Sequence, residues 1–202
     1  KSFSNDKIYK SEEGLKYTYL FWLYIKDVPN NSNWNSGYDS KKGIISHFHS
    51  PNVYYDPLKN VIELSFGYKN AGEELLKYIF QIENFKLQTW QQIACVVNNR
   101  YISIYLNGKI YKATLLPNVP WVADRMLYLG QPENNCNGYI SYFEYYNNAL
   151  SGDEIESVYN DRKGSLSDNL MSYSQYFYNK KTKRTRPSNL GKDNWLNQLF
   201  FG

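Results

Sequence analysis

The stretch that decides the fold is residues 101–114, which read YISIYLNGKIYKAT. Two runs rich in isoleucine and tyrosine flank the pair Asn107-Gly108. That pair can supply the two positive φ angles of a type I′ turn, and the flanking β-branched and aromatic residues favour strands. The stretch therefore predicts a two-stranded β-hairpin.

Residues 15–150 form a series of such runs, separated by clusters of Gly, Pro, Asn and Asp. Asn98-Asn99 is predicted to make a further hairpin turn, and Asp56-Pro57 begins a turn before the next strand. Many strands, tight turns and almost no helix predict an antiparallel sandwich. The expected strands are Tyr17–Ile25, Gly43–Phe48, Val53–Tyr55, Val61–Phe66, Tyr78–Ile82, Trp90–Val97, Tyr101–Leu106, Lys109–Thr114, Met126–Leu129 and Tyr139–Tyr146.

The composition of the 202-residue chain fits one such sandwich. Hydrophobic residues make up 42% and aromatic residues 18%, which argues for a packed core and against wholesale disorder. Two cysteines and two histidines argue against a disulfide-dense miniprotein, a four-thiolate zinc site and a multi-histidine metal centre. No apolar run approaches the ~18 residues of a membrane span, and no signal peptide is evident. The chain begins with Lys1, so a signal or anchor before it stays open.

One helix is predicted after the last of these strands. Ser151 and Glu154 have the spacing of a capping box, and Ile155, Val158 and Tyr159 then form an apolar stripe. Gly164 is expected to end the helix as its C′ residue. A helix this short and amphipathic should lie against the edge of the sandwich.

Four segments carry a family resemblance, in family order. They are the opening strand 17–25 with its Phe-Trp pair, the Trp-led strand 90–97, the Tyr-x-Asn-Gly hairpin in 102–109, and the closing block 127–155 with its Gly-x-Ile strand and Leu-Ser helix cap. This order resembles the laminin-G-like members of the concanavalin A-like lectin/glucanase superfamily. The resemblance covers about residues 15–163 and implies an all-β, two-sheet antiparallel jelly-roll sandwich with one short C-terminal helix. The predicted domain is residues 1–164, and the extended tail after Gly164 has no counterpart in the family.

Residues 165–202 are predicted to be an attachment tail rather than a second domain. Roughly forty residues without Cys or His are too few for an independent core. The tail's aromatic residues should pack on a neighbouring subunit or along the sandwich, where strand 17–25 is apolar on both faces. These tail residues are Tyr173, Tyr176, Phe177, Tyr178, Trp195, Leu199, Phe200 and Phe201.

Charge is distributed unevenly along the chain. Eight basic and two acidic residues from Arg162 onward give +6, which leaves −2 for residues 1–161. A near-neutral body argues against nucleic-acid binding by the sandwich, because phosphate contact needs a basic face. The run 180–186 could meet a polyanion, although a solvated or partner-docked tail is the better interpretation.

Catalytic chemistry is not predicted. Glycanases of this superfamily place carboxylates in an alternating Glu-x-Asp-x-Glu strand, which supplies a nucleophile and a general acid on one face. Glu63 and Glu144 each stand alone in their strands. Glycoside hydrolase activity is therefore disfavoured.

Metal sites receive little support from the sequence. His47-Phe48-His49 would place two imidazoles on one face of a strand, although exposed or hydrogen-bonded histidines explain the pattern as well. Family members often bind calcium at the sandwich rim through Asp and Asn side chains. The candidates by position are Asp39, Asp124, Asn134 and Asn135, but no spaced calcium loop is present, and no cofactor is expected.

The two cysteines leave two alternatives. A bridge between Cys95 and Cys136 would close a long loop and stabilise the fold by up to ~4 kcal/mol. The favoured interpretation is one buried structural thiol, Cys95, and one loop thiol, Cys136.

Candidate ligand-binding residues are aromatic and asparagine side chains near turns. Flat rings there can stack on sugar faces with amide groups alongside, although such rings can equally plug the ends of the sandwich. The candidates are Trp34, Asn35, Tyr38, Tyr54, Tyr55, Trp121, Asn134 and Asn135.

Two functions are compatible with these features. The first is a non-catalytic recognition or adhesion module that binds glycan or protein through rim loops. The alternative is a structural subunit of a larger assembly, such as a virion or surface layer, docked to neighbouring subunits through residues 165–202. Either function places the chain outside the cell, at a cell surface or in a virion.

Overall fold

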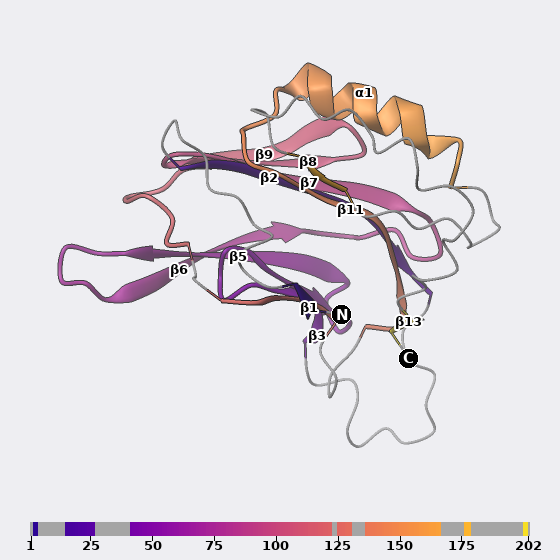
Figure 1. Cartoon of the computed structure of the whole chain (residues 1–202). Coiled ribbons are helices and arrows are strands. Elements are labelled where there is room, and N and C mark those ends of the chain that lie inside the picture. The colour runs from indigo at the N-terminus through magenta and orange to yellow at the C-terminus, as the bar shows by residue number, and fades with distance from the viewer. Residues whose placement is uncertain are drawn as a thin grey trace.

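The structure is a computed structural model that describes residues 2–3, 15–26, 41–122, 125–130, 136–166, 176–178 and 200–201. Two β-sheets stack face to face, and one helix covers the outer face of the upper sheet (Figure 1). The predicted two-sheet jelly-roll sandwich is confirmed. Within the described residues, no helix is long and apolar enough to cross a membrane.

The strands are arranged as two sheets with mainly antiparallel pairing. Among the described strands, the pair β11–β12 alone is parallel. The lower sheet, called sheet A, has the order β1 (Ser2–Phe3), β10 (Leu127–Leu129), β3 (Lys42–Ser46), β4 (Asn52–Asp56), β5 (Val61–Lys69), β6 (Leu75–Ile82). The upper sheet, sheet B, has the order β12 (Tyr176–Tyr178), β11 (Gly138–Tyr146), β2 (Lys16–Ile25), β7 (Gln91–Asn98), β8 (Tyr101–Leu106), β9 (Lys109–Leu115), and β13 (Phe200–Phe201) also pairs with β11.

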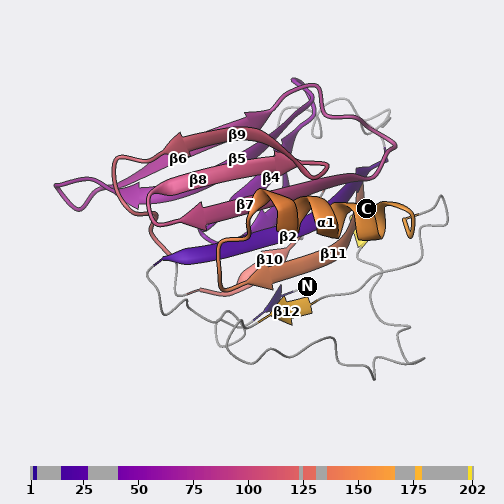
Figure 2. The ribbon, with the colours of Figure 1, turned by 90° about the horizontal axis from the view of Figure 1, so that it is seen from above.

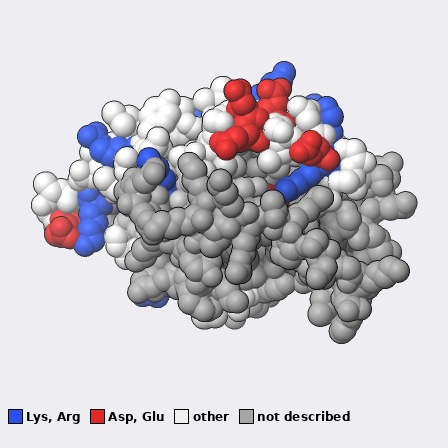
Figure 3. Space-filling model, turned by 45° about the horizontal axis from the view of Figure 1, so that its top comes forward, with Lys and Arg blue, Asp and Glu red and all other residues white. Residues whose placement is uncertain are grey.

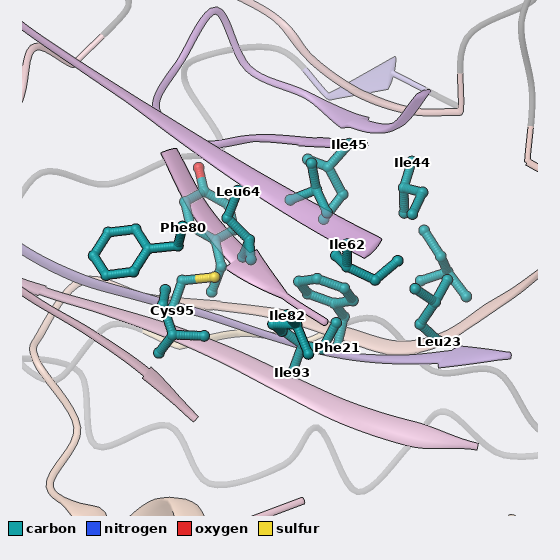
Figure 4. Packing of buried hydrophobic residues seen from close by; sticks show 14 of the residues in the cluster. Phe21, Leu23, Ile44, Ile45, Ile62, Leu64, Phe80, Ile82, Ile93 and Cys95 are labelled. Atoms are coloured by element: carbon teal, nitrogen blue, oxygen red, sulfur yellow. The ribbon is translucent and has the colours of Figure 1, made fainter. Parts of the chain in front are cut away.

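The main core lies between the sheets, because alternate residues of each strand point inward. Phe21 and Leu23 of β2 meet Ile62 and Leu64 of β5 there, and all four are fully buried (Figure 4). The ten-residue strand β2 therefore contributes one face to this core, as the sequence predicted.

The helix α1 (Gly152–Lys163) covers the other face of β2. It lies over sheet B (Figure 2), where Ile155 packs into a second buried cluster with Leu20. The Tyr159 ring stacks on Trp22 with centroids 5.5 Å apart. In the described residues the outer cover of β2 is thus this helix, while the predicted contacts of the tail's aromatic side chains lie outside the described residues.

Both ends of α1 follow from its sequence, with one correction. The Ser151 hydroxyl accepts from the Glu154 amide while the Glu154 side chain accepts from the Ser151 amide, so the capping box is confirmed. Gly164 is the C-cap residue with φ −81°, so the helix ends without the left-handed C′ glycine that was predicted.

A buried ion pair fixes the last turn of α1 to sheet B. Arg162 Nη2 lies 2.6 Å from Oε1 of Glu144, a β11 residue with no exposed surface. The Tyr146 hydroxyl donates to the other carboxylate oxygen at 2.6 Å. Glu144 is therefore a structural anchor for the helix.

The predicted turns are confirmed at two of three places. Asn107 and Gly108 have φ of 52° and 79°, as a type I′ turn requires. The Asp56 carboxylate accepts from the amides of Leu58 and Lys59 and starts the turn into β5. In the third turn Asn98 pairs with Tyr101, so the two loop residues are 99 and 100 rather than the two asparagines.

Two further sequence-based expectations concern the tail and the cysteines. Described tail segments pair with β11 of the same chain, because β12 lies beside Glu144–Tyr146 and β13 beside Gly138 and Tyr139. Cys95 and Cys136 are both buried free thiols, so the bridge is not formed. The favoured interpretation, a buried thiol at Cys95 and a loop thiol at Cys136, therefore holds, since Cys136 lies just before β11. Cys136 is buried as well, and burial raises its pKa to about 12.

Candidate functional site

Three chain segments meet at one end of sheet A and are joined by hydrogen bonds. They are the β3–β4 turn (47–51), residues 120–122 and residues 125–126. The Ser50 hydroxyl donates to the Trp121 carbonyl oxygen at 2.8 Å, and the Trp121 amide donates to the Gly67 carbonyl oxygen at 2.8 Å. A cis peptide bond links Ser50 and Pro51 in the first of these segments. These hydrogen bonds hold the segments together at this end of the sandwich, hereafter the rim.

A hollow of about 370 Å³ opens at this rim, within the ~300–1,000 Å³ range of ligand pockets. Tyr128 belongs to β10 and pairs with Ser46 of β3, so both side chains lie on the outer face of sheet A. Phe48, Met126 and Tyr128 are 38%, 43% and 44% exposed. The hollow, hereafter the rim hollow, is lined by Ser46, Phe48, Arg125, Met126 and Tyr128.

Rings and one guanidinium group shape the rim hollow. The Phe48 ring meets the Trp121 ring edge to face, with centroids 5.3 Å apart and an interplanar angle of 67°. The guanidinium carbon of Arg125 lies 4.5 Å from the Phe48 ring centroid, which is cation–π distance. The Tyr128 hydroxyl reaches the Met126 sulfur at 3.6 Å. The surface therefore combines aromatic faces with one cation and two hydroxyl groups, of Ser46 and Tyr128.

His47 connects the rim hollow to the core. Burial lowers the pKa of this imidazole, so the ring is neutral at neutral pH. The Nε2 atom of His47 lies 3.2 Å from the Arg125 carbonyl oxygen, and its Nδ1 atom lies 3.2 Å from the Ser50 carbonyl oxygen and 2.9 Å from the Tyr19 hydroxyl. The tautomer with the proton on Nε2 donates to Arg125, and the tautomer with the proton on Nδ1 can donate to Ser50. His47 thereby positions the backbone that carries the Arg125 side chain.

His47 and His49 are hydrogen-bonded histidines, as the sequence favoured, but their predicted position on one face of a strand is wrong. β3 ends at Ser46, and Phe48 and His49 adopt left-handed φ of 46° and 64°, so the chain turns between the two imidazoles. His49 Nδ1 instead lies 2.9 Å from the Ser65 hydroxyl. Within the described ranges, no group of three His, Cys, Asp or Glu side chains could hold a metal ion.

The structure separates the predicted ligand-binding residues. Trp121 lies at the rim against Phe48. Tyr54 lies on β4, half-buried, where its hydroxyl accepts from the Asn52 amide group at 3.2 Å. Tyr55 is 1% exposed in the main core, so its proposed contact with ligand is wrong because its β4 position points inward. The remaining candidates, Trp34, Asn35, Tyr38, Asn134 and Asn135, and the calcium candidates Asp39 and Asp124, lie outside the described residues.

None of the five residues that line the rim hollow, Ser46 included, is among the ligand-binding residues predicted from the sequence. A signal for Tyr128 existed, because an aromatic residue between Leu127 and Leu129 must point away from a core that takes both leucines. Phe48, Arg125 and Met126 had no comparable local signal.

The two strand carboxylates do not form a pair on one sheet face. Glu63 is opposite Tyr54 and Gln81 on the neighbouring strands. Its carboxylate accepts from Gln81 at 3.0 Å and pairs with Lys41. Glu144 is the anchor of α1 on the other sheet, so these two carboxylates do not form the pair that glycoside hydrolysis uses.

Comparison with known proteins agrees with this architecture. A family model described as the concanavalin A-like lectin/glucanases superfamily matches residues 5–156. A search of curated protein sequences finds no match.

Solved structures with a similar fold include toxin binding domains. The botulinum neurotoxin serotype D binding domain is 19% identical with a TM-score of 0.54, over 73% of this chain and 37% of that one. The botulinum neurotoxin type G receptor-binding domain is 18% identical with a TM-score of 0.53, over 77% and 41%. The binding domain of Paraclostridial Mosquitocidal Protein 1 is 15% identical with a TM-score of 0.52, over 72% and 37%. The chain thus spans less than half the length of each, and the likeness concerns the fold.

Proposed function

Because the chain belongs to the concanavalin A-like lectin/glucanases superfamily, we propose that it is a non-catalytic recognition module that binds a glycan through the rim hollow. The superfamily contains both lectins and glucanases, so membership alone does not decide between sugar binding and sugar hydrolysis. The residues of the site have to decide it. The separate positions of Glu63 and Glu144 favour binding over hydrolysis.

The single observation that carries the proposal is the exposed aromatic lining of the rim hollow. Phe48 and Tyr128 are both more than one-third exposed although each ring is large and apolar. Aromatic faces stack on the apolar faces of sugar rings, while nearby hydroxyl and guanidinium groups provide hydrogen bonds to sugar hydroxyls. Ser46, Tyr128 and Arg125 supply those groups at the same place.

The comparisons support a binding role at a surface outside the cell. The similar structures are binding domains of neurotoxins and of a mosquitocidal protein. By analogy we place this module on a secreted or cell-surface protein. A protein surface is the alternative ligand class, since aromatic residues also dominate protein interfaces.

The alternative function, docking into a larger assembly through residues 165–202, has weaker support. The tail segments that the structure describes, β12 and β13, pair with β11 of the same chain. Those segments are therefore engaged by the sandwich itself, and virion association stays a prediction without direct support.

The experiment is binding of the full chain to an oligosaccharide array, with a matched pair of variants. Tyr128→Ala removes a lining ring, and Tyr101→Ala removes a ring of similar exposure, 48% against 44%, on sheet B. We expect Tyr128→Ala to lose binding at least tenfold and Tyr101→Ala to retain it. Equal behaviour of the two variants, or no bound glycan on a broad array, would overturn the proposal.

A further inference from the structure

Resting on the proposed function, we infer that the rim hollow selects an acidic glycan, whose carboxylate or sulfate group binds the Arg125 guanidinium while an adjacent sugar ring contacts the aromatic lining. The inference depends on the state of the Arg125 side chain, on how its backbone is held, and on the chemistry of the surrounding wall.

The Arg125 guanidinium is available to a ligand. The residue is exposed, and its planar group lies over one face of the Phe48 ring at 4.5 Å. None of the described hydrogen bonds uses its N–H groups, and the carboxylates of Glu63, Glu73 and Glu144 pair with other cations. This contact with the ring uses none of the guanidinium N–H donors, so they can meet a planar anion with two parallel bonds.

The backbone of Arg125 is held before any ligand arrives. His47 lies within hydrogen-bond distance of the Arg125 and Ser50 carbonyl oxygens, at 3.2 Å each, and of the Tyr19 hydroxyl, at 2.9 Å. His47 and Tyr19 are each 1% exposed, so this connection runs through rigid core. Because the backbone is held and the guanidinium contacts the Phe48 ring, the side chain loses less conformational entropy on binding than one without these contacts.

The surroundings favour an acidic sugar over a free anion. Phe48, Met126 and Tyr128 give the rim hollow an apolar wall, which an inorganic ion would leave uncovered. Most of the acidic atoms seen in Figure 3 gather on the upper face of the molecule, with a second group at its left end. The helix α1 carries exposed Asp153, Glu154 and Glu156. An acidic glycan would therefore be disfavoured next to these carboxylates and attracted to the Arg125 cation of the rim hollow.

The test uses glycans in matched triplets. Each triplet contains a neutral oligosaccharide, the same core with a carboxylate-bearing sugar, and the same core with a sulfate ester. The full chain is compared with Arg125→Gln, with Arg125→Lys, and with Lys109→Gln, which removes an exposed cation from β9. Dissociation constants are measured by calorimetry on the triplets that bind.

We expect the acidic members to bind about ten- to a hundredfold more tightly than their neutral cores. Arg125→Gln should abolish that preference, Arg125→Lys should restore part of it, and Lys109→Gln should preserve it. The carboxylate and sulfate arms show which anion is preferred.

Two other outcomes separate the inference from the function on which it rests. Binding without an acidic preference, but sensitive to Phe48→Ala, would overturn the inference and leave glycan recognition at the rim hollow intact. Absence of binding to every triplet, or binding insensitive to Phe48→Ala and Tyr128→Ala, would overturn both. Capture of an acidic peptide instead of a glycan would also overturn both.

Discussion

Replacing Arg162 by methionine tests the buried ion pair that fastens α1 to sheet B. Glu144 has no exposed surface and the Arg162 side chain is 15% exposed, so the variant leaves a carboxylate charge buried at a site built for a 2.6 Å ion pair. Breaking such a pair by removing one partner costs about 3–5 kcal/mol. For a domain of this size each kcal/mol corresponds to about 2–4 °C, so the melting temperature should fall by roughly 6–20 °C.

The assay is urea unfolding followed by tryptophan fluorescence, with calorimetric melting as a second measure. Lys163→Met is the matched control, because Lys163 is exposed in the same turn and should cost less than about 1 kcal/mol. The double variant Arg162→Met/Glu144→Gln removes the charge as well and should recover most of the lost stability. A single variant as stable as the control, or a double variant no better than the single, would refute the reasoning.

Three further predictions follow from burial and backbone geometry. Burial lowers the pKa of His47, so as the pH falls through about 6.5 the unfolded chain binds a proton before the folded chain does. The free energy of unfolding should therefore be highest above that pH and decrease as the pH drops toward the folded pKa. Urea midpoints measured across pH should show this decrease, and it should be smaller in His47→Gln. Gly138→Ala places a Cβ 2.2 Å from a carbonyl oxygen of β2 and should lower the free energy of unfolding by more than about 3 kcal/mol. In the control Gly164→Ala the added Cβ meets nothing within 4 Å, and the free energy of unfolding should change by less than about 1 kcal/mol. Cys95 and Cys136 should resist iodoacetamide in the folded protein and react only in denaturant, which mass spectrometry will detect; rapid labelling of either thiol in the native state would contradict their burial.

The strands and turns were predictable because their signals are local. Asn107-Gly108 determines its own turn, and alternation of apolar residues on either side determines the faces of β8. The capping box of α1 depends on two residues three positions apart. Such patterns need no knowledge of what packs against them.

Most residues of the rim hollow could not be predicted from the sequence, because pairing between distant strands brings them together. Ser46 and Tyr128 become neighbours only when β10 pairs with β3. The choice of Trp121 came from its position beside a turn, while Tyr55 fits the same rule and lies in the core. Proximity to a turn therefore cannot distinguish an aromatic ring at the rim from one in the core. What distinguishes them is whether the side chain lies on the inner or the outer face of its strand.

The most direct test of glycan recognition at the rim hollow uses its methionine. The chain has two methionines, Met126 in the lining and Met171 outside the described residues, so the ¹³C-methyl spectrum of the labelled protein is simple to assign with Met126→Leu. Titration with the tightest glycan from the array should shift the Met126 methyl signal in proportion to the bound fraction measured by calorimetry. A glycan that binds and saturates while the Met126 signal stays unchanged would contradict the account.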